Sequence, residues 1–417
     1  MNAGTATELR FDFEHARASL PVSRLCGECD VPTNRIPRLL SAMALGQTLE
    51  TSFSGTTYHL ARAGMAAHKL EGCFSLCSDE ARLRSVQIRG GLWKLMRVLR
   101  METTAGFKFT SACLDEVWPR HIESLAGANV ISNFQLYGRE FFKRRRSLDI
   151  GAYFYIDGTL TEYFESYGQY DVANIDPSTM RHAIELEREG YQSADGIVVM
   201  SKLSAQTLRE VYRVPQEKIS IVVPGANIAD QAIEDAQDLP ISSQSGDFVL
   251  GFVGLYPLRK GLDRLARATQ ILRARGLPIR LRVIGTSPDE LKQMDGVECL
   301  GIISKRRDPG VFVNAIRGVH LGCLLSRSEL AGIAMVEFLR VGVPILGTRV
   351  GGATDILEGG GSLAVSPHIA PEELAEVIAD VYRDQSRYEV LRSEAIARSG
   401  WASWRRAVDQ LDRVLPC

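Results

Sequence analysis

Short runs of apolar residues alternate with longer amphipathic stretches along most of this chain. Uninterrupted apolar runs predict buried strands, and apolar residues that recur every three or four positions predict helices. In the first half, the pattern predicts strands at 36–43, 71–76, 107–110, 130–134, 151–156, 196–200 and 218–223, and helices that include 57–68, 112–126 and 177–192.

The alternation restarts after a polar, acidic segment that we interpret as a linker, at 230–247. The second half predicts strands at 248–253, 279–284, 297–300, 319–325 and 344–347, and helices at 261–275, 309–317, from near Gly332, and at 371–385. Strand–helix alternation of this kind implies parallel sheets with helices on both faces.

We therefore expect an α/β fold of two Rossmann-like, doubly wound domains, at 34–229 and 248–398, that face each other across a cleft. Residues 1–33 precede the pattern as an amino-terminal extension, and 399–417 follow it as a closing helix. Ligands of open α/β sheets bind outside the carboxyl ends of the strands, so the cleft is the expected site.

Size and charge agree with two soluble domains. The chain has 417 residues, whereas single hydrophobic cores stop growing at roughly 250–300 residues. The 49 Lys and Arg residues balance 50 Asp and Glu residues, which argues against a dedicated nucleic-acid binder. Residues 1–20 contain no apolar stretch typical of a signal peptide, and no apolar run approaches the ~18 residues of a spanning helix. We expect a cytoplasmic protein.

The chain has 8 cysteines, and two pairs of them resemble metal half-sites: Cys26 with Cys29, and Cys73 with Cys77. A structural zinc site needs two well-spaced pairs in a compact module. Buried free thiols are the alternative that we favour, and disulfides are not expected in a reducing cytoplasm.

Several catalytic motifs are absent from the sequence. It has no P-loop, no G-x-G-x-x-G fingerprint, no H-E-x-x-H metal motif and no G-x-S-x-G elbow. These absences argue against a P-loop nucleotidase, a dinucleotide-dependent dehydrogenase, a zinc protease and a serine hydrolase.

Arg259 and Lys260 follow a predicted strand and precede a predicted helix. The amino terminus of a helix favours anions, and two cations there would complete a diphosphate site. A solvated Arg–Lys pair in a loop is the alternative.

Two glutamates lie eight positions apart after the strand predicted at 319–325. Glu337 lies in an otherwise apolar run and suits a ribose diol, because a carboxylate accepts two hydroxyl hydrogen bonds. Glu329 suits a sugar hydroxyl or a developing positive charge, and Gly332 lets the backbone approach a ligand closely. The alternative is that both are surface carboxylates.

These segments resemble the nucleotide-sugar domain of family 4 glycosyltransferases, which have the two-Rossmann GT-B fold. The resemblance rests on Arg259-Lys260-Gly261, on Glu329, Gly332 and Glu337, on Gly342-Val-Pro344 and on Gly351-Gly352. Supporting matches are the turn at 54–56 and a final helix that in the family crosses back to the first domain, and the likeness extends over about 36–417.

The resemblance implies a retaining transferase with a UDP- or GDP-sugar as donor and with no required metal or other cofactor. It places Arg259 and Lys260 on the diphosphate, Glu337 on the ribose and Glu329 on the sugar. The family pattern further places the amides of Gly332, Ile333 and Ala334 on the phosphates, the Gly55–Thr56 turn over the donor, and Ile302 and Ile303 at the base.

Many family members have a histidine at the end of the first-domain strand where this chain has Asp157. Asp157 either orients or deprotonates the acceptor hydroxyl or caps the next helix. We count Asp157 with Glu329, Lys260 and Arg259 as the candidate catalytic residues.

The first domain contains two basic segments with interspersed apolar residues, 82–100 and 139–146. Such segments can lie on anionic lipid at the inner face of a membrane, which would fit a lipid-linked acceptor; a sugar acceptor is the other candidate. The alternative is that each helix packs its apolar side inward and points Arg outward. A phosphorylase or epimerase of the same fold, and an inactive sugar-nucleotide-binding subunit, are the remaining functional alternatives.

Overall fold

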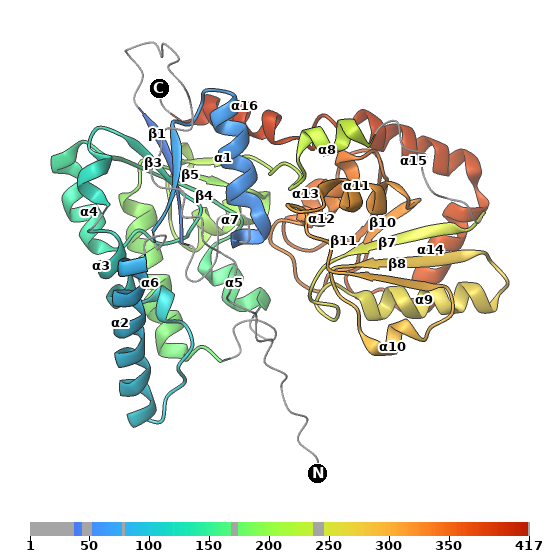
Figure 1. Cartoon of the computed structure of the whole chain (residues 1–417), viewed down its shortest axis with the longest axis horizontal. Coiled ribbons are helices and arrows are strands. Elements are labelled where there is room, and N and C mark those ends of the chain that lie inside the picture. The colour runs from blue at the N-terminus through green and yellow to red at the C-terminus, as the bar shows by residue number, and fades with distance from the viewer. Residues whose placement is uncertain are drawn as a thin grey trace.

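The computed structural model of the chain describes residues 37–43, 52–76, 80–119, 121–167, 174–236 and 246–415. Within these residues, two six-stranded parallel sheets lie side by side, each between layers of helices (Figure 1). The α/β, doubly wound architecture predicted from the hydrophobic pattern is confirmed.

The amino-terminal sheet has the strand order β2-β1-β3-β4-β5-β6. All of its neighbouring strands are parallel, with β1 paired to β2 on one side and to β3 on the other. The strands are β1 (Arg38–Ala42), β2 (Gly72–Ser75), β3 (Asn129–Ser132), β4 (Gly151–Ile156), β5 (Gly196–Val199) and β6 (Ile219–Ile221). The helices of this domain are α1 (Thr56–Ala66), α2 (Glu80–Leu99), α3 (Ser111–Val117), α4 (Arg139–Arg145), α5 (Leu160–Tyr167), α6 (Pro177–Ser193) and α7 (Lys202–Glu210).

The carboxyl-terminal sheet has the order β12-β11-β10-β7-β8-β9, and its strands are also parallel. The strands are β7 (Phe248–Val253), β8 (Ile279–Ile284), β9 (Val297–Gly301), β10 (Leu321–Leu324), β11 (Ile345–Thr348) and β12 (Ser362–Val365). The helices are α8 (Asp230–Asp235), α9 (Leu262–Ala274), α10 (Asp289–Lys292), α11 (Pro309–Arg317), α12 (Ile333–Arg340), α13 (Ala353–Leu357), α14 (Pro371–Arg383), α15 (Gln385–Ala397) and α16 (Trp404–Val414).

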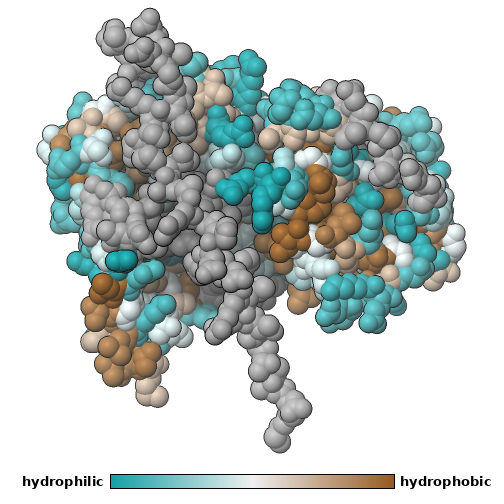
Figure 2. Space-filling model, in the orientation of Figure 1, coloured by the Kyte–Doolittle hydropathy of each residue, from teal (hydrophilic) through white to brown (hydrophobic). Residues whose placement is uncertain are grey.

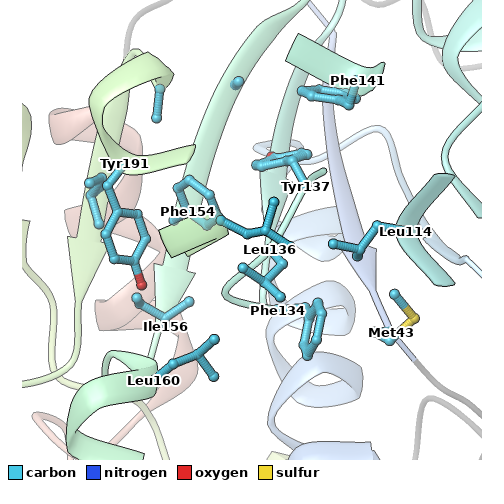
Figure 3. Close-up of a cluster of buried hydrophobic side chains, with 14 of the residues drawn as sticks. Met43, Leu114, Phe134, Leu136, Tyr137, Phe141, Phe154, Ile156, Leu160 and Tyr191 are labelled. Carbon is cyan, nitrogen blue, oxygen red and sulfur yellow. The ribbon is translucent and has the colours of Figure 1, made fainter. Parts of the chain in front are cut away.

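An aromatic cluster fills the space between the amino-terminal sheet and its helices (Figure 3). The rings of Tyr137 and Phe141 stack with their centroids 4.3 Å apart. The buried Tyr137 hydroxyl lies 2.7 Å from the carbonyl oxygens of both Val130 and Tyr153, so its polar tip is satisfied inside the core. The Tyr137 side chain thereby connects the helix layer to both β3 and β4.

Helix α16 returns from the carboxyl-terminal domain and packs on α1 of the amino-terminal domain. The indole Nε1 of Trp404 donates a hydrogen bond to Oδ1 of the buried Asn227, at 3.1 Å. The amide nitrogen of Asn227 donates in turn to the Ser54 carbonyl and to the Thr56 hydroxyl, both at 3.0 Å. One buried amide therefore connects α16 to the turn that begins α1.

Three expectations from the sequence are wrong. Residues 107–110, predicted as a strand, form a short 3-10 helix at Phe107–Phe109 that follows Gly106 in a left-handed conformation. The helix predicted at 112–126 is divided into α3 and a 3-10 turn at Ile122–Leu125, because Pro119 cannot donate the hydrogen bond that a continuous helix needs. Residues 230–235 of the predicted linker form α8, whose apolar side packs on α11.

Candidate functional site between the two domains

The carboxyl ends of both sheets meet where the two domains touch. In the carboxyl-terminal sheet the strand order reverses between β7 and β10, and the loops after these two strands contain Arg259, Lys260 and Glu329. Such a switch point is where open α/β sheets bind ligands. The structure therefore places three of the residues singled out in the sequence at the position that the fold favours for a site.

Arg259 and Lys260 both approach the Glu329 carboxylate. Oε2 of Glu329 lies 3.8 Å from Nη1 of Arg259 and 3.7 Å from Nζ of Lys260. Arg259 also donates to the Ser328 carbonyl at 2.9 Å, and only 6% of its surface is exposed. A Cβ atom at Gly254 would lie 2.4 Å from Cδ of Lys260, so this glycine leaves room for the lysine stem. The solvated-loop alternative is wrong for both cations.

The Glu329 loop is fixed on both sides. Its carboxylate accepts from the Ser326 hydroxyl at 3.3 Å and from the Gly332 amide at 3.4 Å. The Gly351–Gly352 turn lies against the loop backbone so closely that a Cβ atom at Gly351 would meet the Glu329 carbonyl at 1.7 Å. Glycines are needed there because no side chain fits between the two backbones.

Glu337 lies on α12 with 1% of its surface exposed, so it is not a surface carboxylate. Its Oε1 forms a close ion pair with Lys305, a residue that the sequence analysis did not single out. The Lys305 ammonium also lies 4.8 Å from the centre of the Phe312 ring. The second carboxylate oxygen of Glu337, Oε2, is buried and has no hydrogen-bond partner among the described residues. One oxygen of Glu337 is thus compensated, and the other is available to a ligand.

Tyr167, the last residue of α5, extends from the amino-terminal domain onto this site and was also missed. The Arg259 guanidinium lies 4.4 Å from the centre of its ring and 5.1 Å from that of Tyr256. The Tyr167 hydroxyl accepts a hydrogen bond from the Leu330 amide at 3.3 Å. Burial raises the pKa of Tyr167 well above its usual range, so the hydroxyl keeps its proton. A tyrosine at the end of an amphipathic helix has no distinguishing signal in the sequence.

Asp157 follows β4, and its Oδ1 is inaccessible to solvent and unpartnered among the described residues. Burial raises the pKa of Asp157 to about 7, and the negative charges of Glu162 and Glu329 contribute. Thr159 caps α5 instead, because its hydroxyl accepts from the Glu162 amide while the Glu162 carboxylate accepts from the Thr159 amide. The helix-capping alternative for Asp157 is therefore wrong.

The turn at Gly55 and Thr56 begins α1 on the amino-terminal side of the same interface. One turn along α1, the pKa of His59 is lowered to about 4, first by burial and then by the charges of Lys305 and Arg62. Lys305 belongs to the opposite domain, so α1 and the Lys305–Glu337 pair lie within electrostatic reach of each other. His59 is neutral at physiological pH.

The positions predicted to contact the phosphates and the base differ in how they are exposed. Gly332 adopts a left-handed conformation at φ 69° and begins α12, whose first amides, at Ile333 and Ala334, have no partners within the helix. Ile302, just after β9, is 74% exposed, whereas Ile303 is partly buried and packs against the hydrophobic core of the carboxyl-terminal domain. The structure thus brings the phosphate, ribose and sugar candidates together and leaves Ile302 at the surface.

Four buried polar atoms at this interface have no protein partner among the described residues: Arg259 Nε, Ser328 Oγ, Glu337 Oε2 and Asp157 Oδ1. Buried polar groups are nearly always hydrogen-bonded, and exceptions need a water or a ligand. Their concentration where two domains meet indicates a binding site for an elongated polar ligand with both hydroxyl groups and negative charge.

Metal-binding groups are not gathered in the part of the chain that the structure describes: it holds no cluster of three or more His, Cys, Asp and Glu side chains. Cys73 is a free thiol whose pKa is raised to about 12 by burial. Cys26, Cys29 and Cys77 lie outside the described residues.

The two basic segments differ in structure. Within 139–146, Phe141 is buried, and four cations, Arg139, Lys143, Arg144 and Arg145, each pair with a carboxylate. These contacts favour the packing alternative for this segment. Segment 82–100 forms most of α2, and several of its apolar side chains are exposed.

Two doubly wound domains with a charged site between their carboxyl strand ends define a GT-B fold. Residues 235–398, which include most of the carboxyl-terminal domain, match the family described as "Glycosyl transferases group 1".

The curated relatives are similar over part of their length. A D-inositol 3-phosphate glycosyltransferase of Corynebacterium urealyticum is 26% identical over 55% of this chain and 59% of its own length. The Nocardia farcinica protein of the same name is 27% identical over 54% of this chain and 53% of its own. This chain thus spans little more than half the length of the curated relatives it matches.

Solved structures share the fold at low identity. Anabaena HepE, crystallised with UDP and glucose, has a TM-score of 0.59 at 13% identity, with 90% of this chain and 98% of that chain covered. Sucrose-phosphate synthase from Thermosynechococcus elongatus has a TM-score of 0.61 at 16% identity, with 91% and 98% covered.

Proposed function

We propose that this protein is a retaining glycosyltransferase that moves a sugar from a nucleoside-diphosphate sugar to an acceptor hydroxyl. The observation that carries the proposal is the cluster of Arg259, Lys260 and Glu329 at the β7–β10 switch point, with Glu337 on the adjoining helix. The match of residues 235–398 to the glycosyl transferases group 1 family supports it. Cell-surface polysaccharide, glycolipid or small glycoconjugate biosynthesis would use such a reaction.

In the proposed reaction, the bond between the sugar C1 and the diphosphate oxygen breaks, and a bond from C1 to the acceptor oxygen forms on the same face. The leaving diphosphate gains negative charge, which Arg259, Lys260 and the first amides of α12 stabilise where it develops. Glu329, held by these two cations, meets the sugar hydroxyls or the positive charge that develops at C1. The proton of the acceptor hydroxyl leaves to the departing phosphate or to Asp157.

We propose a UDP- or GDP-sugar as the donor, bound without an obligatory metal. The Anabaena structure with UDP and glucose favours UDP. Glu337 takes the ribose through Oε2, the Gly55–Thr56 turn covers the donor, and the strand end at Ile302 and Ile303 meets the base. Activity in excess EDTA should equal activity without it.

The acceptor in this proposal is a sugar or a lipid-linked molecule, met at the cytoplasmic face of a membrane. The name of the curated relatives favours a second acceptor class, a phosphorylated cyclitol. Asp157 would meet the acceptor hydroxyl in either case, because it lies on the amino-terminal side of the interface.

The deciding experiment is a panel of nucleoside-diphosphate sugars, with thermal shift to detect binding and release of the nucleoside diphosphate to detect turnover. A transferase shows both, and product NMR shows a retained anomeric configuration. Binding without release on any acceptor would indicate an inactive subunit. Release of sugar 1-phosphate with inorganic phosphate, or isomerised donor without release, would instead indicate a phosphorylase or an epimerase.

A further inference from the structure

Helix α2 (Glu80–Leu99) has apolar residues on two opposite sides. On the inner side, Val86 is buried and the Trp93 ring packs on Phe107, with ring centroids 5.7 Å apart. On the outer side, Ile88, Leu92, Leu95, Met96 and Leu99 are 65%, 59%, 55%, 50% and 70% exposed. Ile88, Leu92, Leu95 and Leu99 recur every three or four positions and so form a single stripe along the helix.

The exposed apolar surface includes the last turn of the helix and the turn that follows it. Val98 is 59% exposed, and Met101, in the turn that follows α2, is 97% exposed. The helix extends away from the body of the amino-terminal domain (Figure 1), and the space-filling view shows a hydrophobic surface at this place (Figure 2). Contiguous exposed apolar surface of this kind marks a site of interaction with a protein or a membrane.

The charge around the stripe has one sign. Residues 81–101 contain six Arg and Lys and no Asp or Glu. The exposed Arg84, Lys94 and Arg100 have no carboxylate partner within the described residues, whereas Arg89 pairs with Glu116 and the buried Arg97 with Glu102 and Asp176. In helical projection, Arg100 lies on one side of the stripe and Lys94 on the other.

We infer that the outer stripe of α2 docks on an anionic lipid bilayer. Apolar side chains flanked by cations match the acyl and phosphate layers of an anionic leaflet, and each cation near that surface adds attraction. A second copy of the chain fits less well, because residues 81–101 of two identical helices would bring cations against cations. No helix in the described ranges is long and apolar enough to cross a membrane, so α2 would lie on the bilayer surface.

The inference is independent of the proposed reaction, since α2 contributes no residue to the interface between the domains. It assigns the lipid surface to α2, whose outer apolar side chains are exposed. A lipid-facing α2 would hold the protein beside acceptors that are embedded in the same leaflet.

The test is co-sedimentation of the full chain with vesicles of phosphatidylcholine alone and with about 30% phosphatidylglycerol, where attraction to anionic lipid should appear. We expect wild-type protein to bind the anionic vesicles at least about tenfold more tightly than the neutral ones. The double variant Leu95→Gln/Leu99→Gln should lose binding by about tenfold or more, because polar side chains replace buried apolar area. Lys94→Glu/Arg100→Glu should abolish the preference for anionic lipid.

The matched control is Val311→Gln/Val390→Gln in the carboxyl-terminal domain. Both valines are 57% exposed, an exposure similar to that of Leu95. It should bind like wild type. Equal binding of wild type and the Leu95/Leu99 variant would overturn the inference. The inference would also be overturned if wild type did not bind vesicles but formed a concentration-dependent dimer that the Leu95/Leu99 variant lacks. The stripe would then be an interface between two copies of the chain.

Discussion

On the carboxyl-terminal side of the domain interface, charged groups lie against one another. Arg259 and Lys260 share the Glu329 carboxylate, and Lys305 pairs with the buried Glu337. On the amino-terminal side, burial disfavours the charged forms of two titratable groups. It lowers the pKa of His59 to about 4 and raises the pKa of Asp157 to about 7.

This difference separates two chemical tasks. Cations paired with carboxylates in a poorly solvated place suit the recognition of a diphosphate and a ribose. A carboxyl group that titrates near physiological pH suits the handling of an acceptor proton. This difference agrees with the proposed function, in which the carboxyl-terminal side recognises the donor and Asp157 meets the acceptor, and single substitutions on each side test that division.

The largest effect is expected at Lys260. Replacing Lys260 with Ala removes a cation from the site where the leaving diphosphate gains charge, so turnover should fall about 10²–10³-fold. The fold should be little affected, because the lysine has one ion-pair contact, at 3.7 Å. Steady-state kinetics and circular dichroism measure the two effects. Lys292→Ala, at an exposed ion pair with Asp289 in α10, is the control. Unchanged turnover in Lys260→Ala on the true substrates would refute the donor-side assignment.

Asp157→Asn should lower kcat/KM by about 10²-fold, because the amide cannot take the acceptor proton. In wild type, kcat/KM should rise as pH increases toward about 7, where Asp157 loses its proton, and the variant should lack this rise. A pH–rate profile that keeps its ascending limb in Asp157→Asn would assign the limb to another group.

The raised pKa of Asp157 also predicts the direction in which the free energy of unfolding changes with pH. Between its ordinary pKa near 3.8 and about 7, the folded protein holds a proton at Asp157 that the unfolded chain has released. The Asp157 contribution to the free energy of unfolding should therefore fall as pH rises through that window. Urea titrations at several pH values should show a smaller fall in Asp157→Asn than in wild type.

Lys305→Met tests the Lys305–Glu337 ion pair on the carboxyl-terminal side, and a smaller effect is expected than at Lys260 or Asp157. Glu337 would stay buried without its counter-ion, so the Kd for the nucleoside diphosphate should rise about tenfold, with a larger effect on donor KM than on kcat. Lys305→Arg should restore most of the affinity. If Lys305→Met bound the nucleotide as wild type does, Lys305 would have no part in orienting Glu337.

The smallest effect is expected from Tyr167→Phe. This change removes the hydroxyl that accepts from the Leu330 amide and leaves the ring over Arg259. One neutral hydrogen bond contributes about 1 kcal/mol, so kcat/KM should fall about three- to fivefold. Tyr167→Leu, which also removes the ring, should have a larger effect on donor affinity. Equal effects from the two variants would mean that the ring over Arg259 contributes nothing.

The fold was predictable because each buried strand of a parallel sheet is a separate apolar run. The positions of Lys260, Glu329 and Glu337 near the strand ends were predictable because these residues lie at short, fixed spacing from such runs. Lys305 and Tyr167 were missed because their importance comes from residues far away in the chain, Glu337 and Arg259. The outward direction of the α2 stripe was not predictable either. Its two apolar sides have similar spacing, and only tertiary packing shows which one the domain covers.

The most direct test of the account is isothermal titration of the protein with UDP and with GDP, in wild type and in the Lys260→Ala/Glu337→Gln double variant. We predict that wild type binds one of the two nucleotides at a single site per chain, and that the double variant weakens that binding at least about a hundredfold. Undiminished binding by the double variant, or no binding of either nucleotide by wild type, would contradict the assignment of this interface as a nucleotide-sugar site.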